Sequence, residues 1–365
     1  MVCVFFGGLG QGIVNPKLPE ILHDHTQLAL DSGISASLMY LGIFLASFLY
    51  GRWCDRGRVF RLLATGLFFY SIVLVCFSQS GSREAIFIFR FLEGLSLSAI
   101  FVAADYVLCR ASANSDRGQW LSYYGVALSI GLLFGPAIIL ILDWLATPHS
   151  LLKSLLGVAT AALLLAITSL RYELPSTEKQ NDAPLRESRA ALAAILYGFF
   201  EAGLVATLAA TALKSTSLRV EYVFILIILS AAIASIYWGN RIDKIGGRKT
   251  LQQVFLMLFL GLGALLLIPL FFSVPERILA AAVIFGIAAG GIYPAGFAWL
   301  IEGSDASQYG YASGLFTRAY GFGSLFGPLC FGLFIEKNGQ VGLYMLACFL
   351  GFLGILASRY SKKIL

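Results

Sequence analysis

The sequence predicts an all-α membrane protein with twelve transmembrane helices arranged as two pseudo-symmetric six-helix bundles. Of its 365 residues, 58% are hydrophobic and 13% are charged, about half the charged share of an ordinary soluble domain. Apolar stretches of about 20 residues, the length that a helix needs to cross a bilayer, recur along the whole chain. Motifs that recur nearly 190 residues apart indicate two parallel copies of one six-helix unit.

Each expected span is an apolar run between polar or charged turns. The first has no basic stretch before it and no small-residue cleavage site, so we interpret it as a membrane span rather than a signal peptide. The expected spans are residues 1–22, 34–53, 62–80, 84–109, 118–141, 151–170, 190–212, 220–239, 250–272, 276–301, 310–335 and 341–358.

One long polar segment, "RYELPSTEKQNDAPLRES" from Arg171 to Ser188, separates six spans from six. Its two prolines and mixed charges are typical of a linker. We therefore expect an N-terminal six-helix bundle at residues 1–170, a cytoplasmic linker at 171–188 and a C-terminal bundle at 189–365.

The net charge of +6 is a topology signal rather than a sign of nucleic-acid binding. Lys and Arg gather in the loops on the side of the N-terminus, which the positive-inside rule places in the cytoplasm. We expect a monomer in the plasma (inner) membrane with both termini cytoplasmic. Of the 26 basic residues, 17 belong to this side: Arg52, Arg56, Arg58, Arg61, Arg110, Arg117, Arg171, Lys179, Arg186, Arg189, Arg241, Lys244, Arg248, Lys249, Arg359, Lys362 and Lys363.

The turn after the second span of each half carries a charged motif, "GRWCDRGR" (51–58) and "GNRIDKIGGRK" (239–249). This arrangement resembles the major facilitator superfamily, whose signature at this turn is Gly-x-x-x-Asp-Arg/Lys-x-Gly-Arg-Arg/Lys. The second copy matches it fully and the first is one residue shorter. The matching residues are Gly51, Asp55, Arg56, Gly57 and Arg58, and Gly239, Asp243, Lys244, Gly246, Arg248 and Lys249.

We interpret these turns as a conformational latch. Glycine lets adjacent helices approach closely, and an Asp at a helix end can pair with the following basic residues and with a neighbouring helix terminus. The shorter first copy predicts a weaker effect for Asp55 than for Asp243. The alternative is that the charges only set topology.

The fourth span contains "RFLEGLSLSA" (90–99), which resembles the family's Arg-x-x-x-Gly motif of proton-coupled exporters. Arg90 lies within the expected bilayer and Glu93 lies one turn on, so the two can form a pair in one helix. Arg90 is either part of a proton relay or half of a structural ion pair. Asp105 either lines the same cavity or anchors the inner loop.

The fifth span, "GVALSIGLLFGP" (125–136), resembles the family's antiporter motif. We expect its glycines to allow close packing and its proline to bend the helix; generic packing is the alternative. Its small residues and proline recur 192 positions later in the eleventh span. The two sets are Gly131, Gly135 and Pro136, and Gly323, Gly327 and Pro328.

Glu201 lies in the middle of the seventh span, in "GFFEAGL", and no Lys or Arg lies within one helical turn of it. Because an ionised carboxylate is costly at that depth, its protonated form is favoured. We expect Glu201 to be the main proton-binding or cation-binding carboxylate. Arg318 of the eleventh span is its candidate counter-charge, and a static Glu201–Arg318 bridge is the competing interpretation.

The resemblance implies a secondary transporter that works by alternating access, with substrate bound near the bilayer midplane between the halves. Proton-coupled antiport of a small organic compound is our first hypothesis. Proton-coupled uptake of a metabolite is the second, and a non-transporting receptor or lipid-handling protein is the third. Because the sequence has neither HExxH nor a nucleophile elbow, we expect no enzymatic activity, and we expect neither a cofactor nor a metal.

Overall fold

The computed structural model describes residues 1–21, 28–80, 82–113, 115–145, 149–172, 188–204, 220–267 and 273–359. Within this part of the chain the regular structure is helical and no strand occurs. Nine of the described helices are long and apolar enough to cross a membrane, and residues 2–15 and 191–204 form shorter apolar helices. The all-α prediction is therefore confirmed for the described residues.

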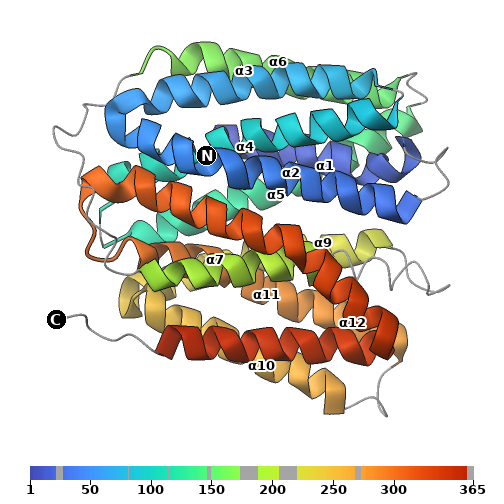
Figure 1. Ribbon diagram of the computed structural model, residues 1–365, viewed down its shortest axis with the longest axis vertical. Helices are drawn as coiled ribbons and strands as arrows, with labels where there is room; N and C mark the ends of the chain where they lie inside the picture. Colours follow the sequence, from blue (N-terminus) through green and yellow to red (C-terminus); the bar gives the residue numbers. More distant parts are fainter. Residues whose placement is uncertain are drawn as a thin grey trace. The chain divides into compact units, whose positions relative to one another are not determined.

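The chain divides into two compact units (Figure 1). Unit 1 contains residues 1–111, 127–183 and 304–321, and unit 2 contains residues 112–126, 184–303 and 322–365. Each unit therefore includes a short segment from the other half of the sequence. These segments are the first turns of α5 (Arg117–Trp144) and of α12 (Tyr309–Arg359).

Unit 1 is built around α4, which packs against both α2 and α3, while α6 packs along α3. Its interior is lined by branched apolar side chains such as Ile13, Leu67, Leu97 and Ile100, all fully buried. Besides parts of α5 and α12, its elements are α1 (Val2–Ile21), α2 (Leu28–Trp53), the π-helical turn η1 (Cys54–Arg58), α3 (Val59–Ser78), α4 (Arg83–Ala111) and α6 (Ser150–Ser169); η4 (Ala306–Gln308) precedes α12.

Unit 2 has a similar arrangement, in which α11 packs against α9, α10 and α7. A capping box starts α11: the N–H of Glu276 donates to Ser273 Oγ, and the N–H of Ser273 donates to Glu276 Oε2, which satisfies two groups at the helix end. Its elements are η2 (Ser188–Ala190), α7 (Ala191–Gly198), the π-helical turn η3 (Phe199–Leu204), α9 (Val220–Ile245), α10 (Gly247–Leu267) and α11 (Val274–Leu300).

Three of the four described glycines with positive φ lie at helix ends or helix breaks of the expected spans. Gly57 (φ 73°) lies within η1 and Gly246 (φ 83°) lies between α9 and α10, so both charged motifs turn at a glycine, a residue that adopts this conformation without a Cβ clash. Gly339 (φ 59°) interrupts α12. The two expected spans at 310–335 and 341–358 therefore lie on either side of this break.

Some element boundaries differ from the sequence expectation. The second and eighth spans are longer than expected, because α2 already begins at Leu28 and α9 continues to Ile245. Asp243 therefore lies in the last turn of a helix rather than in a loop. The seventh expected span, 190–212, continues beyond the described residues, which end here at Leu204.

Candidate functional site

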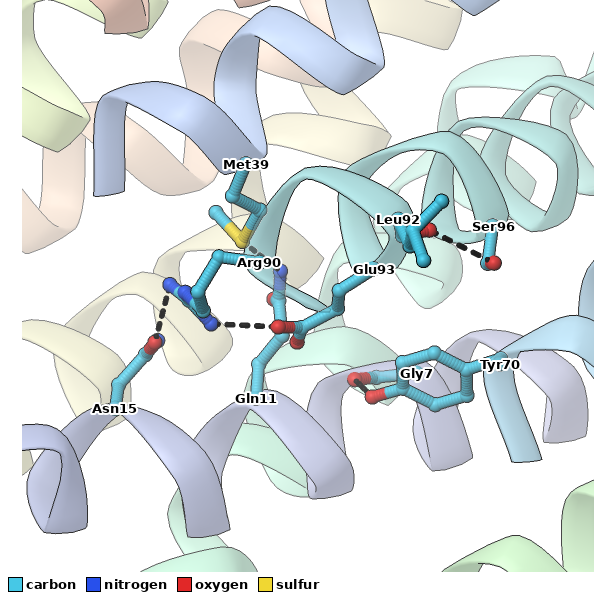
Figure 2. Close-up of polar contacts among 9 residues, drawn as sticks. All are labelled: Gly7, Gln11, Asn15, Met39, Tyr70, Arg90, Leu92, Glu93 and Ser96. Carbon is cyan, nitrogen blue, oxygen red and sulfur yellow. Dashed lines mark hydrogen bonds and ion pairs between the residues drawn. The ribbon is translucent and has the colours of Figure 1, made fainter. Parts of the chain in front are cut away.

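A cluster of polar side chains lies inside unit 1, and its centre is the buried Arg90–Glu93 pair of α4 (Figure 2). Arg90 Nη1 lies 2.7 Å from Glu93 Oε2, and the two residues are only 2% and 1% exposed. The predicted pairing within one helix is therefore present. Because both charges are removed from solvent, each would be strongly destabilising in this position without the other.

Three other helices contribute to this cluster. Arg90 Nη2 donates to Asn15 Oδ1 of α1 at 3.0 Å, and Gln11, one turn earlier, donates to Met39 Sδ of α2 at 3.5 Å. Tyr70 of α3 donates its hydroxyl to the carbonyl oxygen of Gly7 at 3.0 Å. Sequence reasoning missed these partners, although Gln11 and Asn15 are polar residues four apart in an apolar span and so share one helix face.

The cluster has unused hydrogen-bonding capacity. Among the described residues, neither Arg90 Nε nor Glu93 Oε1 has a partner, and both atoms are buried. A carboxylate oxygen without a donor can accept a proton, and a guanidinium N–H without an acceptor can donate to a bound group. The geometry therefore suits a group that changes its protonation state or its partners.

Asp105 belongs to a different region of α4. Fifteen residues separate it from Arg90, which corresponds to about 22 Å along a helix. Asp105 is buried, and its Oδ2 lies 3.4 Å from Ser313 Oγ of α12, which is also 3.1 Å from the carbonyl oxygen of Val102. These contacts place Asp105 beside the start of α12 and not in the Arg90 cluster.

The Asp residue of each charged motif accepts hydrogen bonds from the first turn of a helix. Asp55 accepts from the N–H groups of Gly310 and Tyr311 at the start of α12, both at 2.8 Å. A helix N-terminus has unpaired N–H groups and a partial positive charge, so a carboxylate satisfies both requirements there.

Asp243 makes the equivalent contact in unit 2, where it accepts from the N–H groups of Gly118 and Gln119 of α5 at 2.7 and 3.2 Å. The two motifs make matching contacts although the first copy is one residue shorter, and the relative effect of the two Asp residues stays a prediction. Asp55 is buried and Asp243 only half-buried, and the π-helical turn with its glycine accommodates the missing residue.

The other motif residues surround these two contacts. A Cβ at Gly51 would collide with the carbonyl oxygen of Gly310, and one at Gly239 would lie 2.6 Å from Ser122 Oγ, so both glycines permit close helix contact. The basic residues Arg56, Arg58 and Lys244 are exposed.

Arg248 has a different role from the exposed basic residues. Its Nε and Nη2 donate to the carbonyl oxygens of Ser358 and Arg359 at 2.7 and 2.6 Å. These carbonyls end α12, where a cation is favourable.

The repeated glycines of the fifth and eleventh spans are packing contacts. Gly131 and Gly135 of α5 lie against α1, where a Cβ would collide with the backbone of Phe5 and of Gly12. Gly323 and Gly327 of α12 lie in the same way against Ile195 and Phe199. The helices continue through the prolines that follow, Pro136 and Pro328.

Glu201 and Arg318, the other two candidates, belong to different units. Glu201 lies half-buried in the π-helical turn η3 of unit 2, a kind of helix distortion that is frequent at functional sites. Arg318 lies in the part of α12 that belongs to unit 1, with its guanidinium over the rings of Phe44 and Phe48. The pairing of Glu201 with Arg318 stays a prediction.

Comparison with known proteins identifies a family. The model of the Major Facilitator Superfamily matches residues 1–200 and again residues 190–363. The chain is 27% identical to multidrug resistance protein 1 of Bacillus subtilis over 49% of this chain and 45% of that protein. It is 29% identical to the class D tetracycline resistance protein of Salmonella ordonez, over 58% and 56% of the two chains.

A third relative matches over most of its length. Multidrug resistance protein 2 of Bacillus subtilis is 22% identical over 92% of this chain and 87% of that protein. The matches to the first two relatives span only about half of those proteins. Among solved structures, the human organic anion transporter MFSD10 has the same fold, with a TM-score of 0.82, 20% identity and 98% and 97% of the two chains covered.

Proposed function

Because the chain belongs to the Major Facilitator Superfamily of membrane transporters, we propose that it exports a small organic compound in exchange for protons. Its likeness to two multidrug resistance proteins and a tetracycline resistance protein supports export of a drug-like compound. The distribution of Lys and Arg supports a multi-pass arrangement in the plasma membrane with both termini in the cytoplasm.

The observation that carries the proposal is the Arg90–Glu93 pair, a titratable ion pair buried in a membrane-spanning helix. Ionisable groups in such helices are costly and are typical of proton and substrate pathways. A proton that binds the unpaired Glu93 Oε1 neutralises the carboxylate and weakens its hold on Arg90. Arg90 then keeps its bond to Asn15 of α1, so it stays attached to α1 while its pairing with Glu93 within α4 weakens.

Alternating access also needs contacts that form in one conformation and break in another. The Asp55 and Asp243 contacts with helix N-termini suit this role, because each consists of two hydrogen bonds to a single turn. A carboxylate at a helix N-terminus contributes about 0.5–2 kcal/mol. Contacts of this strength hold one conformation and still break during turnover.

Glu201 is the proposed main proton-binding carboxylate, and Glu93 acts with it. Glu201 lies in a π-helical turn of a short apolar helix, and carboxyl groups within membrane-spanning helices are typical of proton pathways. Loading and unloading of a proton at this position then depends on whether the site faces the acidic or the alkaline side of the membrane.

The experiment measures transport driven by a pH gradient in proteoliposomes, with tetracycline as the probe. Glu201→Gln keeps the shape of the side chain and removes titration, so it should still bind tetracycline but lose transport driven by the gradient. Exchange of labelled for unlabelled tetracycline, which needs no gradient, should continue.

Glu84→Gln is the matched control, because Glu84 is exposed at the start of α4. It should transport tetracycline like the unmodified protein. An unchanged pH dependence in Glu201→Gln would move the proton site to Glu93 or Asp105. No transport of tetracycline or of other drug-like compounds by the unmodified protein, with a normal fold, would contradict export.

A further inference from the structure

Arg318 is a cation in a membrane-spanning helix, and its position requires an explanation. It lies nine residues after Tyr309, the first residue of α12, which corresponds to about 13 Å along the helix. An arginine at such a position almost always faces a partner or a water-filled cavity.

The contacts of Arg318 in unit 1 are with aromatic rings. Its guanidinium carbon lies 4.9 Å from the ring centre of Phe44 and 5.4 Å from that of Phe48, both on α2. Among the described residues of unit 1, no carboxylate lies within ion-pair distance of it. Cation–π contacts contribute about 0.5–2 kcal/mol each, and Arg318 is only half-buried, so part of its side chain is accessible to a further partner.

A second arginine lies at the same ring. The guanidinium carbon of Arg52 is 4.2 Å from the ring centre of Phe48, so two cations share one aromatic side chain. Asp55, only three residues later, directs its carboxylate oxygens to the N–H groups of Gly310 and Tyr311. This group of side chains therefore combines two positive charges with an aromatic surface.

The aromatic surface extends beyond Phe48. Tyr40, one turn before Phe44, makes an edge-to-face contact with Tyr320, with ring centres 5.9 Å apart. Phe48 is 40% exposed, so its ring is accessible from outside unit 1. We call Arg52, Arg318, Phe44, Phe48, Tyr40 and Tyr320 the Arg–aromatic cluster.

We propose that the Arg–aromatic cluster binds an organic anion that carries an aromatic ring, and that such anions are the substrate class of this protein. The guanidinium of Arg318 has N–H donors in a fixed plane, which suits the two oxygens of a carboxylate or sulfonate. The rings of Phe44 and Phe48 then contact the aromatic part. The substrate assignment rests on the proposed transport function, whereas binding itself does not.

The experiment compares three probes that share a ring system and differ in charge: 2-naphthoate, 2-naphthamide and 2-naphthylmethylammonium. Thermal unfolding of the purified protein in a neutral detergent reports binding, because a ligand that binds the folded state raises its melting temperature. Naphthoate should raise the melting temperature by several degrees, and the amide and the ammonium should not.

Variants assign the effect to the cluster. Arg318→Gln should weaken naphthoate binding more than about tenfold, since it removes a charge-assisted bidentate contact, and Phe48→Leu should weaken it less. Arg318→Lys retains the charge but lacks the planar set of donors. It replaces Arg318→Gln in this binding test if the Gln variant does not fold. Arg61→Gln, an exposed position on α3, is the control and should bind like the unmodified protein.

Three kinds of result would overturn the proposal. The first is an equal response to all three probes, or naphthoate binding that is unchanged in both Arg318 variants. The second is naphthoate binding that appears only in Glu201→Gln, which would make Glu201 the partner of Arg318. The third is displacement of naphthoate by phosphatidylglycerol in nanodiscs of the unmodified protein, which would assign the cluster to a lipid headgroup. Binding is measured as a change in melting temperature and needs no pH gradient. The binding result therefore remains valid even if the protein does not transport these compounds.

Discussion

Arg90 illustrates how a charge is accommodated inside a membrane-spanning helix. Two of its nitrogens have acceptors, Glu93 on its own helix and Asn15 on α1. The pair carries no net charge, so the remaining cost is that of desolvating two ions, which their attraction offsets in part. Removing one member leaves the other charge buried and unpaired.

We therefore expect Arg90→Ala to abolish proton-coupled transport and to lower stability. Breaking a buried pair on one side costs about 3–5 kcal/mol in soluble proteins. The melting temperature of the protein in detergent and gradient-driven tetracycline uptake measure the two effects separately.

The double variant Arg90→Ala with Glu93→Gln distinguishes a proton relay from a structural pair. Removing both charges should restore much of the melting temperature, because no unpaired ion remains. Transport should stay uncoupled from the pH gradient. Full recovery of coupled transport would show that the pair is only structural.

The two Asp contacts allow a comparison within one chain. Asp55 is buried and its hydrogen bonds are both 2.8 Å, whereas Asp243 is half-buried with bonds of 2.7 and 3.2 Å. In Asp55→Asn one carboxylate oxygen is replaced by an NH₂ group. This group is a donor and cannot accept the hydrogen bond of the backbone N–H that it faces. The substitution should weaken the contact by about 1–2 kcal/mol.

Because this contact holds one conformation, Asp55→Asn should slow tetracycline transport at normal expression, and at least as strongly as Asp243→Asn. Initial transport rates in proteoliposomes, set against the Glu84→Gln control, measure the effect. Normal rates in both Asp variants would leave these charges with a topology role only.

Helices approach one another most closely where glycine replaces a side chain. Gly323 of α12 lies against the carbonyl oxygen of Ile195, whereas a Cβ at Gly332 of the same helix would meet no atom within 4 Å beyond its chain neighbours and its own helix backbone. Both substitutions by Ala gain the same helix propensity, about 1 kcal/mol. The difference in melting temperature between the two Ala variants therefore reports the cost of the packing contact at Gly323.

We expect Gly323→Ala to lower the melting temperature, since overpacking typically costs about 1–3 kcal/mol, and Gly332→Ala to leave it equal or higher. Thermal unfolding of the two variants in the same detergent provides the comparison. Equal melting temperatures would indicate that the helices separate easily at this contact.

Apolar runs and glycine spacing predicted the helices well, because both follow from local chemistry that the bilayer enforces. The Asp55 contact could be foreseen only as a tendency toward some helix terminus, since its donors lie 255 residues away. Asn15 and Tyr70 were missed for the same reason. A single polar residue in an apolar span does not reveal which helix will face it.

Across the whole protein, the basic charge predicts which loops face the cytoplasm. Single cysteines in a variant without native cysteines test this orientation with a membrane-impermeant maleimide. Arg56→Cys and Lys244→Cys should react only after the cells are permeabilised, and Ser82→Cys and Glu336→Cys should react in intact cells. All four positions are exposed, so a reversed labelling pattern would invert the orientation.

The two Asp contacts have a consequence for the two halves of the sequence. Asp55 of the first repeat contacts Gly310 of the second, and Asp243 of the second contacts Gly118 of the first. In an isologous dimer both subunits use the same surface, so each contact occurs twice with the roles of the subunits exchanged. The two Asp contacts follow this pattern between the two repeats. Two separate six-helix polypeptides with these residues would form both contacts when they pair. Fragments severed within 171–188 should accordingly complement each other when co-expressed, because each carries the donors for the other's carboxylate.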